Sequence, residues 1–318
     1  MELVIVDATY PDDSIERAAA GELGVAVRRA LVDAPGAIPA AVGDAEGLLV
    51  HVMAIDAAVL EACPALRVLG RYGVGVDSID VDAATARGIA VVNVPDYGTE
   101  EVASHAAALV LTVARRVPEA DRLVRAGRWD DWAELRPIAP LADCTLGLVG
   151  IGRIGSELVR QIGPLFGSVL AVDPSPATMP DGVERVELEA LLGRSDIVSL
   201  HLPLTADTRH VIDAAALASM RPHAALVNVS RGGLVDQAAL AAALELGRPR
   251  FAALDVLDEE PPPATEPLLR SDRVLLTNHI AWYSERAMRR LRHELAERCA
   301  RVLRGESVAS VVNSEGLR

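Results

Sequence analysis

Short apolar runs alternate with alanine-rich stretches along the whole chain. The runs are dominated by Val, Ile and Leu and are bounded by polar or glycine-containing segments, which is typical of buried parallel strands. The stretches between them carry apolar residues at helical spacing. This alternation predicts successive βαβ units, and therefore an α/β protein built on parallel sheets.

The first hundred residues predict a small open sheet. Strands are expected at 3–6, 47–52, 68–70 and 90–94, and helices at 15–20, 57–62 and 80–87. Pro95 then interrupts the pattern, and a long apolar helix runs from Thr99 to Ala114 with Glu100 and Glu101 at its positively polarised start. We expect this helix to lead from the first domain into a second one.

The second half predicts a larger sheet followed by a long terminal helix. Strands are expected at 145–149, 169–172, 197–202, 226–229, 252–256 and 274–277. The last helix, at 284–303, places Met288, Leu291, Leu295 and Val302 on one face, and Gly305 follows at the position of a C-terminal stop. A chain of 318 residues with this pattern fits two domains.

The chain contains no lysine, and all 31 of its cationic side chains are arginine. This excludes chemistry that needs an amine, such as Schiff bases or the lysine of a phosphate-binding loop. The formal net charge is −14 and the arginines are scattered among acids. Because such a surface repels polyanions, a small-molecule partner is favoured over nucleic acid or an anionic membrane.

Neither a targeting segment nor a metal site is expected from the sequence. The first residues lack a basic leader, and no apolar stretch approaches the length of a membrane span, so we expect a cytoplasmic protein. Cys63, Cys144 and Cys299 are far apart and odd in number, which fits neither a disulfide framework nor a zinc pattern. We therefore predict no metal.

A glycine-rich turn follows the first strand of the second sheet. Gly150, Gly152 and Gly155 have the spacing that permits a tight turn, close approach of a pyrophosphate and close packing of the following helix. The next strand ends in Asp173, about 20 residues after Gly152, where a carboxylate would bind the ribose hydroxyls and repel a 2′-phosphate. The sequence thus predicts a dinucleotide site that favours NAD over NADP.

Three later strand ends deliver side chains suited to proton and hydride chemistry. Arg231 follows the strand at 226–229, Glu260 follows the next, and His279 follows the last. Because parallel strands end at one edge of a sheet, these side chains should lie near the dinucleotide. An Arg can bind a substrate carboxylate, and a His with a carboxylate behind it is an acid/base pair whose protonated form is favoured.

With these motifs in order, the chain resembles the D-isomer-specific 2-hydroxyacid dehydrogenase family. The resemblance also covers the segment from Arg71 to Asp77 and extends over nearly the whole sequence. It implies two Rossmann-like or flavodoxin-like α/β domains with parallel sheets, the cofactor domain being inserted into the substrate domain. Residues 99–284 would form the NAD-binding domain, and residues 1–98 and 285–318 the substrate domain.

The resemblance also implies roles for individual residues. Arg231 would bind the 2-oxo acid, His279 would be the acid/base, and Glu260 would be the carboxylate behind its imidazole. Asp255 would hold the nicotinamide carboxamide. The implied cofactor contacts are Gly150, Gly152, Arg153, Ile154, Gly155, Asp173, His201, Pro203, Thr208, Val229, Ser230, Arg231, Asp255 and His279, and the implied substrate contacts are Arg71, Gly73, Val74, Gly75, Met53 and Trp282.

Within the family, the loop from His279 to Trp282 resembles the branch that contains the C-terminal-binding-protein corepressors. This leaves two functions open, an NAD-dependent reductase of a small 2-oxo acid, or a dinucleotide-sensing binding protein; a homodimer is implied for either. Trp282, Met53 and Tyr72 suggest an apolar substrate, whereas Arg71 would suit a second carboxylate or a phosphonate. Asn278 departs from the proline usual before the catalytic histidine.

Overall fold

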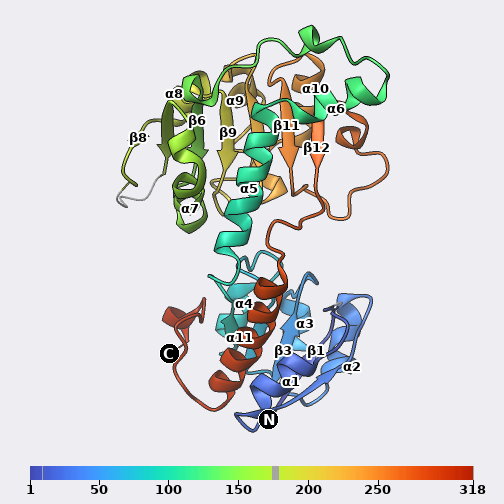
Figure 1. The fold of residues 1–318 in the computed structure, drawn as a ribbon. Helices are drawn as coiled ribbons and strands as arrows, with labels where there is room; N and C mark the ends of the chain where they lie inside the picture. Colours follow the sequence, from blue (N-terminus) through green and yellow to red (C-terminus); the bar gives the residue numbers. More distant parts are fainter. Residues whose placement is uncertain (9, 174–178, 318) are drawn as a thin grey trace. The chain divides into compact units, whose positions relative to one another are not determined.

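The computed structural model describes residues 1–8, 10–173 and 179–317 of the chain. The chain divides into two compact units. Unit 1 comprises Met1–Gly98 together with Ser284–Arg318, and unit 2 comprises Thr99–Tyr283. Figure 1 shows both as layers of helices on a sheet.

In the described part of unit 1, five parallel strands form one sheet. They are β1 Glu2–Ile5, β2 Ala26–Arg29, β3 Gly47–Val50, β4 Val68–Arg71 and β5 Ala90–Val92. Their order is β2-β1-β3-β4-β5, with Leu3 in register with Gly47 on one side and Val27 on the other. The helices of this unit are α1 Ser14–Gly21, α2 Ile38–Val42, α3 Ala57–Glu61, α4 Val81–Ala86 and α11 Glu285–Leu303.

Helices cover both faces of this sheet. α2, α3 and α4 contribute Ile38, Leu60 and Ala84 to a core with one sheet face. α11 packs beside α1 and against β4 on the other face (Figure 1). A Cβ at Gly70 would lie 2.5 Å from the Cys299 Sγ of α11, so the glycine permits this close approach.

In the described part of unit 2, seven parallel strands form the second sheet. They are β6 Thr145–Val149, β7 Ser168–Val172, β8 Val183–Arg185, β9 Ile197–Leu200, β10 Ala225–Asn228, β11 Phe251–Leu254 and β12 Val274–Leu276, in the order β12-β11-β10-β9-β6-β7-β8. The helices are α5 Thr99–Ala114, α6 Val117–Arg125, α7 Arg153–Ile162, α8 Leu188–Arg194, α9 Ala214–Ser219 and α10 Gln237–Glu245. Short 3-10 helices of unit 2 lie at Trp132–Leu135, Leu141–Asp143, Gly163–Leu165, Gly232–Leu234 and Pro267–Arg270. Two more, at Pro35–Ala37 and Ser314–Gly316, belong to unit 1.

Two apolar cores lie on the two faces of the second sheet. α5 and α7 form one with residues such as Val110 and Leu158, and α8, α9 and α10 form the other with residues such as Leu191 and Leu240. The predicted α/β class with parallel sheets is confirmed. Within the described residues, no helix combines the length and apolarity needed to cross a membrane.

The sequence pattern does not predict the edge strands β2 and β8. Each carries charged residues, Arg28 and Arg29 in β2 and Glu184 and Arg185 in β8. Edge strands face solvent on one side, so they need no continuous apolar run, and charge there opposes pairing with other chains. The pattern therefore found the strands with apolar runs, including the edge strands β5 and β12, and missed the two edge strands that carry charges.

Candidate active site

His279 and Glu260 form a close pair at the carboxyl ends of two neighbouring strands. His279 follows β12 and Glu260 lies in the loop after β11. The Nδ1 atom of His279 lies 2.5 Å from Oε2 of Glu260, and the two side chains are 40% and 35% exposed. The imidazole is therefore held through Nδ1 while its other nitrogen remains available for proton exchange.

The surroundings of Glu260 keep its carboxylate ionised. Burial by itself would raise its pKa, but the hydrogen bond and charge of His279 lower it, as do the Leu257 amide and the Arg231 charge, so the pKa lies below its usual value. The Leu257 N–H donates to Oε1 at 2.8 Å. A charged carboxylate behind an imidazole stabilises the imidazolium form.

The loop that carries His279 is anchored by Asp255, which is only 1% exposed. His279 has a φ of 55°, a strained value for a residue with a side chain. Its N–H donates to the Asp255 carbonyl at 2.7 Å. The Asp255 carboxylate accepts bonds from Thr277 Oγ1 at 2.5 Å and from the Ile280 and Ala281 amides at 3.0 Å. These bonds stabilise the strained position.

Arg231 is delivered by a loop that is locked to the loop of Glu260. Asn228 donates to the Arg231 carbonyl at 2.8 Å and accepts from the Ser230 amide at 3.0 Å. A Cβ at Gly232 would lie 2.0 Å from the carbonyl carbon of Leu257. Because no larger residue fits there, the two loops are in direct contact, and Arg231 is close enough to lower the Glu260 pKa.

The glycine turn after β6 has an open position at the start of α7. Gly150 has a φ of 97°, and a Cβ there would lie 2.7 Å from the His201 carbonyl oxygen. A Cβ at Gly155 would lie 2.6 Å from the Gly150 carbonyl oxygen, whereas nothing lies within 4 Å of one at Gly152. Exposed amides at a helix start with open space beside them fit a pyrophosphate.

Asp173 lies beside this turn, at the end of β7. Its Oδ2 atom accepts a bond from the Ile151 amide at 2.8 Å, and its carbonyl accepts one from Arg185 at 2.6 Å. A carboxylate next to the glycine turn fits the adenosine ribose of a dinucleotide. The described residues thus fit NAD.

The family model for the NAD-binding domain of the D-isomer-specific 2-hydroxyacid dehydrogenases matches residues 107–281. A glyoxylate reductase of Korarchaeum cryptofilum is 44% identical over 266 residues, which cover 82% of this chain and 80% of that protein. The chain belongs to the D-isomer-specific 2-hydroxyacid dehydrogenase family. The expected family membership is confirmed, and unit 2 contains the NAD-binding domain of this dehydrogenase family.

Two further relatives support the family assignment. A D-3-phosphoglycerate dehydrogenase of Mycobacterium tuberculosis is 40% identical over 310 residues, which cover 96% of this chain and 58% of that protein. A solved D-lactate dehydrogenase of Aquifex aeolicus, complexed with NAD and lactic acid, has a TM-score of 0.85 at 27% identity, with 96% of each chain covered. The chain spans about half the length of the phosphoglycerate dehydrogenases that it matches.

The remaining cofactor positions expected for a dehydrogenase of this family lie at strand ends of unit 2. Burial lowers the pKa of His201 to about 4, and its Nε2 atom lies 2.9 Å from Ser199 Oγ. The Thr208 hydroxyl donates to the Pro203 carbonyl at 2.7 Å, which stabilises the loop between them. Arg153 is exposed, Ile154 and Ser230 are half-buried, and Val229 is buried.

The expected substrate contacts lie in both units. In unit 1, Met53 follows β3, Arg71 is the last residue of β4, and Gly73, Val74 and Gly75 follow it. Trp282 belongs to unit 2. Gly73 has a φ of 144°, and its carbonyl accepts a bond from Val94 N at 3.0 Å. The Asn93 side chain donates to the Val74 carbonyl at 2.6 Å. These bonds hold the glycine loop to the sheet.

The sequence does not predict the part that His105 plays in the structure. We expect it from the sequence to be an unremarkable surface or core histidine. In the structure its Nε2 atom lies 3.1 Å from Thr277 Oγ1 and 3.6 Å from Asp255 Oδ1. The two partners are far from it along the chain, so no local motif could reveal that α5 supports the His279 loop. Asp255 likewise anchors this loop, and its binding of the nicotinamide stays a prediction.

Proposed function

We propose that this chain is an NAD-dependent dehydrogenase that interconverts a small 2-oxo acid and the corresponding D-2-hydroxy acid. The observation that carries the proposal is the 2.5 Å contact between His279 Nδ1 and Glu260 Oε2 beside the Arg231 loop. It combines a proton donor, its orienting carboxylate and a substrate-binding cation at one sheet edge.

In this proposal, His279 exchanges the proton and Glu260 sets its orientation. The Nε2 atom of His279 would give a proton to the carbonyl oxygen during reduction and accept the hydroxyl proton during oxidation. Glu260 stabilises the imidazolium that reduction requires. Arg231 would bind the carboxylate and polarise the carbonyl, since its planar guanidinium can make paired hydrogen bonds to oxygens.

Unit 2 would hold the dinucleotide through the glycine turn and Asp173. The amides around Gly152 would bind the pyrophosphate, and Asp173 would bind the ribose hydroxyls and disfavour a 2′-phosphate. When bound, NADH supplies the hydride that reduces the carbonyl carbon. The cofactor preferred by this chain is therefore NAD.

The substrate would bind unit 1 through the amides of Gly73, Val74 and Gly75. We infer a 2-oxo acid with a medium apolar or thioether side chain, because Met53 and Trp282 are apolar candidates for its contacts. Arg71 would instead favour a second carboxylate or a phosphonate. Replacing Arg71 by Ala should separate these classes, since only doubly anionic substrates would lose a partner selectively.

A screen of 2-oxo acids with NADH tests the function. It should include glyoxylate, pyruvate, 4-methyl-2-oxopentanoate, 4-methylthio-2-oxobutanoate and 3-phosphohydroxypyruvate, with NADH oxidation as the readout. We expect turnover that is abolished in His279→Ala. Tight NADH binding without turnover of any of these acids would instead favour a dinucleotide-sensing protein. A preference for the phosphorylated acid would contradict the apolar assignment.

Glu260→Gln tests the acid/base pair. The amide retains a hydrogen-bonding group but removes the charge that would stabilise the imidazolium. We expect the rate to fall about tenfold. An unchanged rate in this variant, with His279→Ala inactive, would show that Glu260 is not the partner. Light scattering of the purified chain tests the proposed homodimer.

A further inference from the structure

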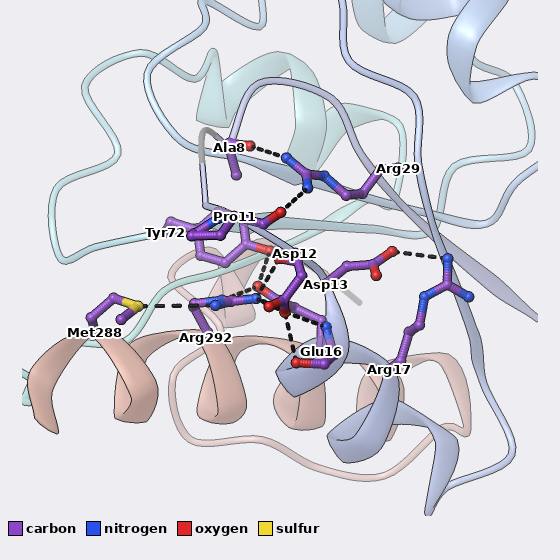
Figure 2. Close-up of polar contacts among 11 residues, drawn as sticks. Ala8, Pro11, Asp12, Asp13, Glu16, Arg17, Arg29, Tyr72, Met288 and Arg292 are labelled. Atoms are coloured by element: carbon purple, nitrogen blue, oxygen red, sulfur yellow. Dashed lines mark hydrogen bonds and ion pairs between the residues drawn. The ribbon is translucent and has the colours of Figure 1, made fainter. Parts of the chain in front are cut away.

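A buried ion pair joins the first and last helices of unit 1. Glu16 on α1 is fully buried, and Arg292 on α11 is 3% exposed. Arg292 Nη2 lies 2.6 Å from Glu16 Oε2, and Arg292 Nε lies 2.8 Å from Oε1. Figure 2 shows this two-pronged contact between the helices.

Tyr10, Asp12 and Tyr72 surround this ion pair. We name the five residues Tyr10, Asp12, Glu16, Tyr72 and Arg292 the Glu16 cluster. The Tyr72 hydroxyl donates to Glu16 Oε1 at 3.0 Å, and Arg292 Nη2 donates to the Asp12 carbonyl at 2.6 Å (Figure 2). The Arg292 guanidinium lies 4.7 Å from the centre of the Tyr10 ring. The Tyr10 and Tyr72 rings pack edge to face at 5.4 Å.

Stability alone does not account for such a cluster. Removing two charges from water is costly, and replacing a buried ion pair with apolar residues is often neutral or stabilising. Unlike an apolar contact, a hydrogen-bonded ion pair fixes the orientation of its groups. Both carboxylate oxygens of Glu16 accept bonds from Arg292, and Oε1 also accepts the bond from the Tyr72 hydroxyl. The Tyr72 hydroxyl is therefore held in one place.

Tyr72 is the residue directly before the glycine loop. It follows β4, it is 1% exposed, and the next three residues are Gly73, Val74 and Gly75. The far side of this loop is held by Asn93 and Val94. Its near side is held at Tyr72, whose ring cannot shift without breaking the hydrogen bond to Glu16.

We propose that Glu16 and Arg292 are positioning residues for substrate binding. They hold Tyr72, and through Tyr72 they fix the backbone amides of residues 73–75 that receive the substrate carboxylate. Neither residue touches the substrate. The inference rests on the proposed function, because it assigns a purpose to the glycine loop that exists only if a 2-oxo acid binds there.

Tyr72→Phe and Glu16→Gln test this role. Tyr72→Phe removes one hydroxyl and keeps the buried ring, and Glu16→Gln keeps the shape and removes the charge. We expect the KM for the best 2-oxo acid to rise about tenfold in Glu16→Gln and about threefold in Tyr72→Phe, with kcat within about twofold, as for loss of binding that is equal in ground and transition states. The KM for NADH should not change, because unit 2 carries that site.

A double variant of Glu16 and Tyr72 and a matched control variant complete the test. The double variant should behave as Glu16→Gln does, since both changes break the same contact. Arg17→Gln is the control: Arg17 neighbours Glu16 on α1, but its guanidinium is exposed and pairs with Asp13 at 2.9 Å. This variant should keep the wild-type KM for both substrates. Circular dichroism checks that each variant is folded.

The possible results separate the two proposals. An inactive wild-type chain would reject the proposed function and this inference with it. An active wild type whose folded Tyr72→Phe variant keeps its KM for the 2-oxo acid would reject the inference alone. Equal increases in the KM for NADH and for the 2-oxo acid would also reject it, because they indicate general loosening. If Glu16→Gln does not fold, Tyr72→Phe decides.

Discussion

The two sheets place different groups at the same topological position. In unit 1 the first strand, β1, lies between β2 and β3, and in unit 2 the first strand, β6, lies between β7 and β9. At such a point the connections leave in opposite directions, which opens a crevice at the carboxyl ends of the two central strands. Each sheet therefore has one natural place for an anion.

In unit 2 this crevice is open, whereas in unit 1 a carboxylate of the protein itself occupies it. After β6 comes Gly150, followed by Gly152 with no atom within 4 Å of its missing side chain. Two residues after β1 comes Asp7, and its carboxylate accepts bonds from three successive amides after β3. The donors are His51 N at 2.6 Å, Val52 N at 2.8 Å and Met53 N at 2.7 Å.

One topology can thus use an anion either as a ligand or as a part of the protein. Three amides pointing at one spot would suit a phosphate. In unit 1 an internal carboxylate takes them, so they fix the backbone that carries Met53. In the proposed function, substrate binding in this unit is then left to the glycine loop after β4.

Protonation of His201 should lower the stability of unit 2 at acidic pH. Its pKa is lowered to about 4 by burial, whereas in the unfolded chain it would titrate near 6.5. Since the unfolded state binds the proton more readily, stability should fall as pH drops from 6.5 towards 4, by about 3 kcal/mol in all. All three tryptophans lie in unit 2, so their fluorescence during urea unfolding reports on this unit. His201→Gln should flatten the dependence, and an equally steep dependence in that variant would contradict the assignment.

Gly152→Val should close the open crevice. The added side chain meets no protein atom within 4 Å at Cβ, so folding should be unchanged, but it would occupy the approach of the pyrophosphate. We expect NADH affinity to fall about 100-fold, which corresponds to about 2.7 kcal/mol. Isothermal titration with NADH measures this, and Gly193→Val, at an exposed position of α8 where a Cβ would meet only the Ser219 carbonyl oxygen at 4.0 Å, controls for the added side chain. Unchanged affinity would remove the glycine turn from the proposed site.

Asp7→Ala should remove the carboxylate that occupies the crevice of unit 1. Three amides would lose their acceptor, which costs about 2 kcal/mol. Hydrogen exchange should speed up in the segment around residues 51–53 and stay unchanged in the glycine turn of unit 2. Asp7→Asn retains one acceptor oxygen and should lie between the wild type and Asp7→Ala. Equal exchange in all three proteins would mean that the carboxylate does not hold this loop.

Asp173→Ala should alter cofactor choice without closing either crevice. Loss of the carboxylate would remove the proposed ribose contact and the proposed repulsion of a 2′-phosphate, so the preference for NAD over NADP should shrink about tenfold. The ratio of kcat/KM for the two cofactors measures it. The same ratio in wild type and variant would place the discriminating group elsewhere.

Local features of the sequence were sufficient for much of this architecture. Buried strands are recognisable as apolar runs, and the glycine turn can be recognised from a few consecutive residues. His279 and Glu260 could be paired from sequence because the strands before them are consecutive in the chain and parallel neighbours in the sheet. Their contact is observed at 2.5 Å, while their catalytic roles remain predictions.

Contacts between distant segments were decided only by the tertiary structure. Asp7 meets the amides of residues 51–53, Glu16 meets Arg292, and His105 meets Thr277. In the sequence each is a single polar residue with no periodicity or spacing to mark it, and a charge there looks like a solvated one. Its burial becomes tolerable only when a partner is brought to it by the fold. Neighbours along the chain are thus enough to predict the strands with apolar runs, the class of fold and the glycine turn, whereas contacts made only in the folded chain decide which polar and charged side chains hold the loops.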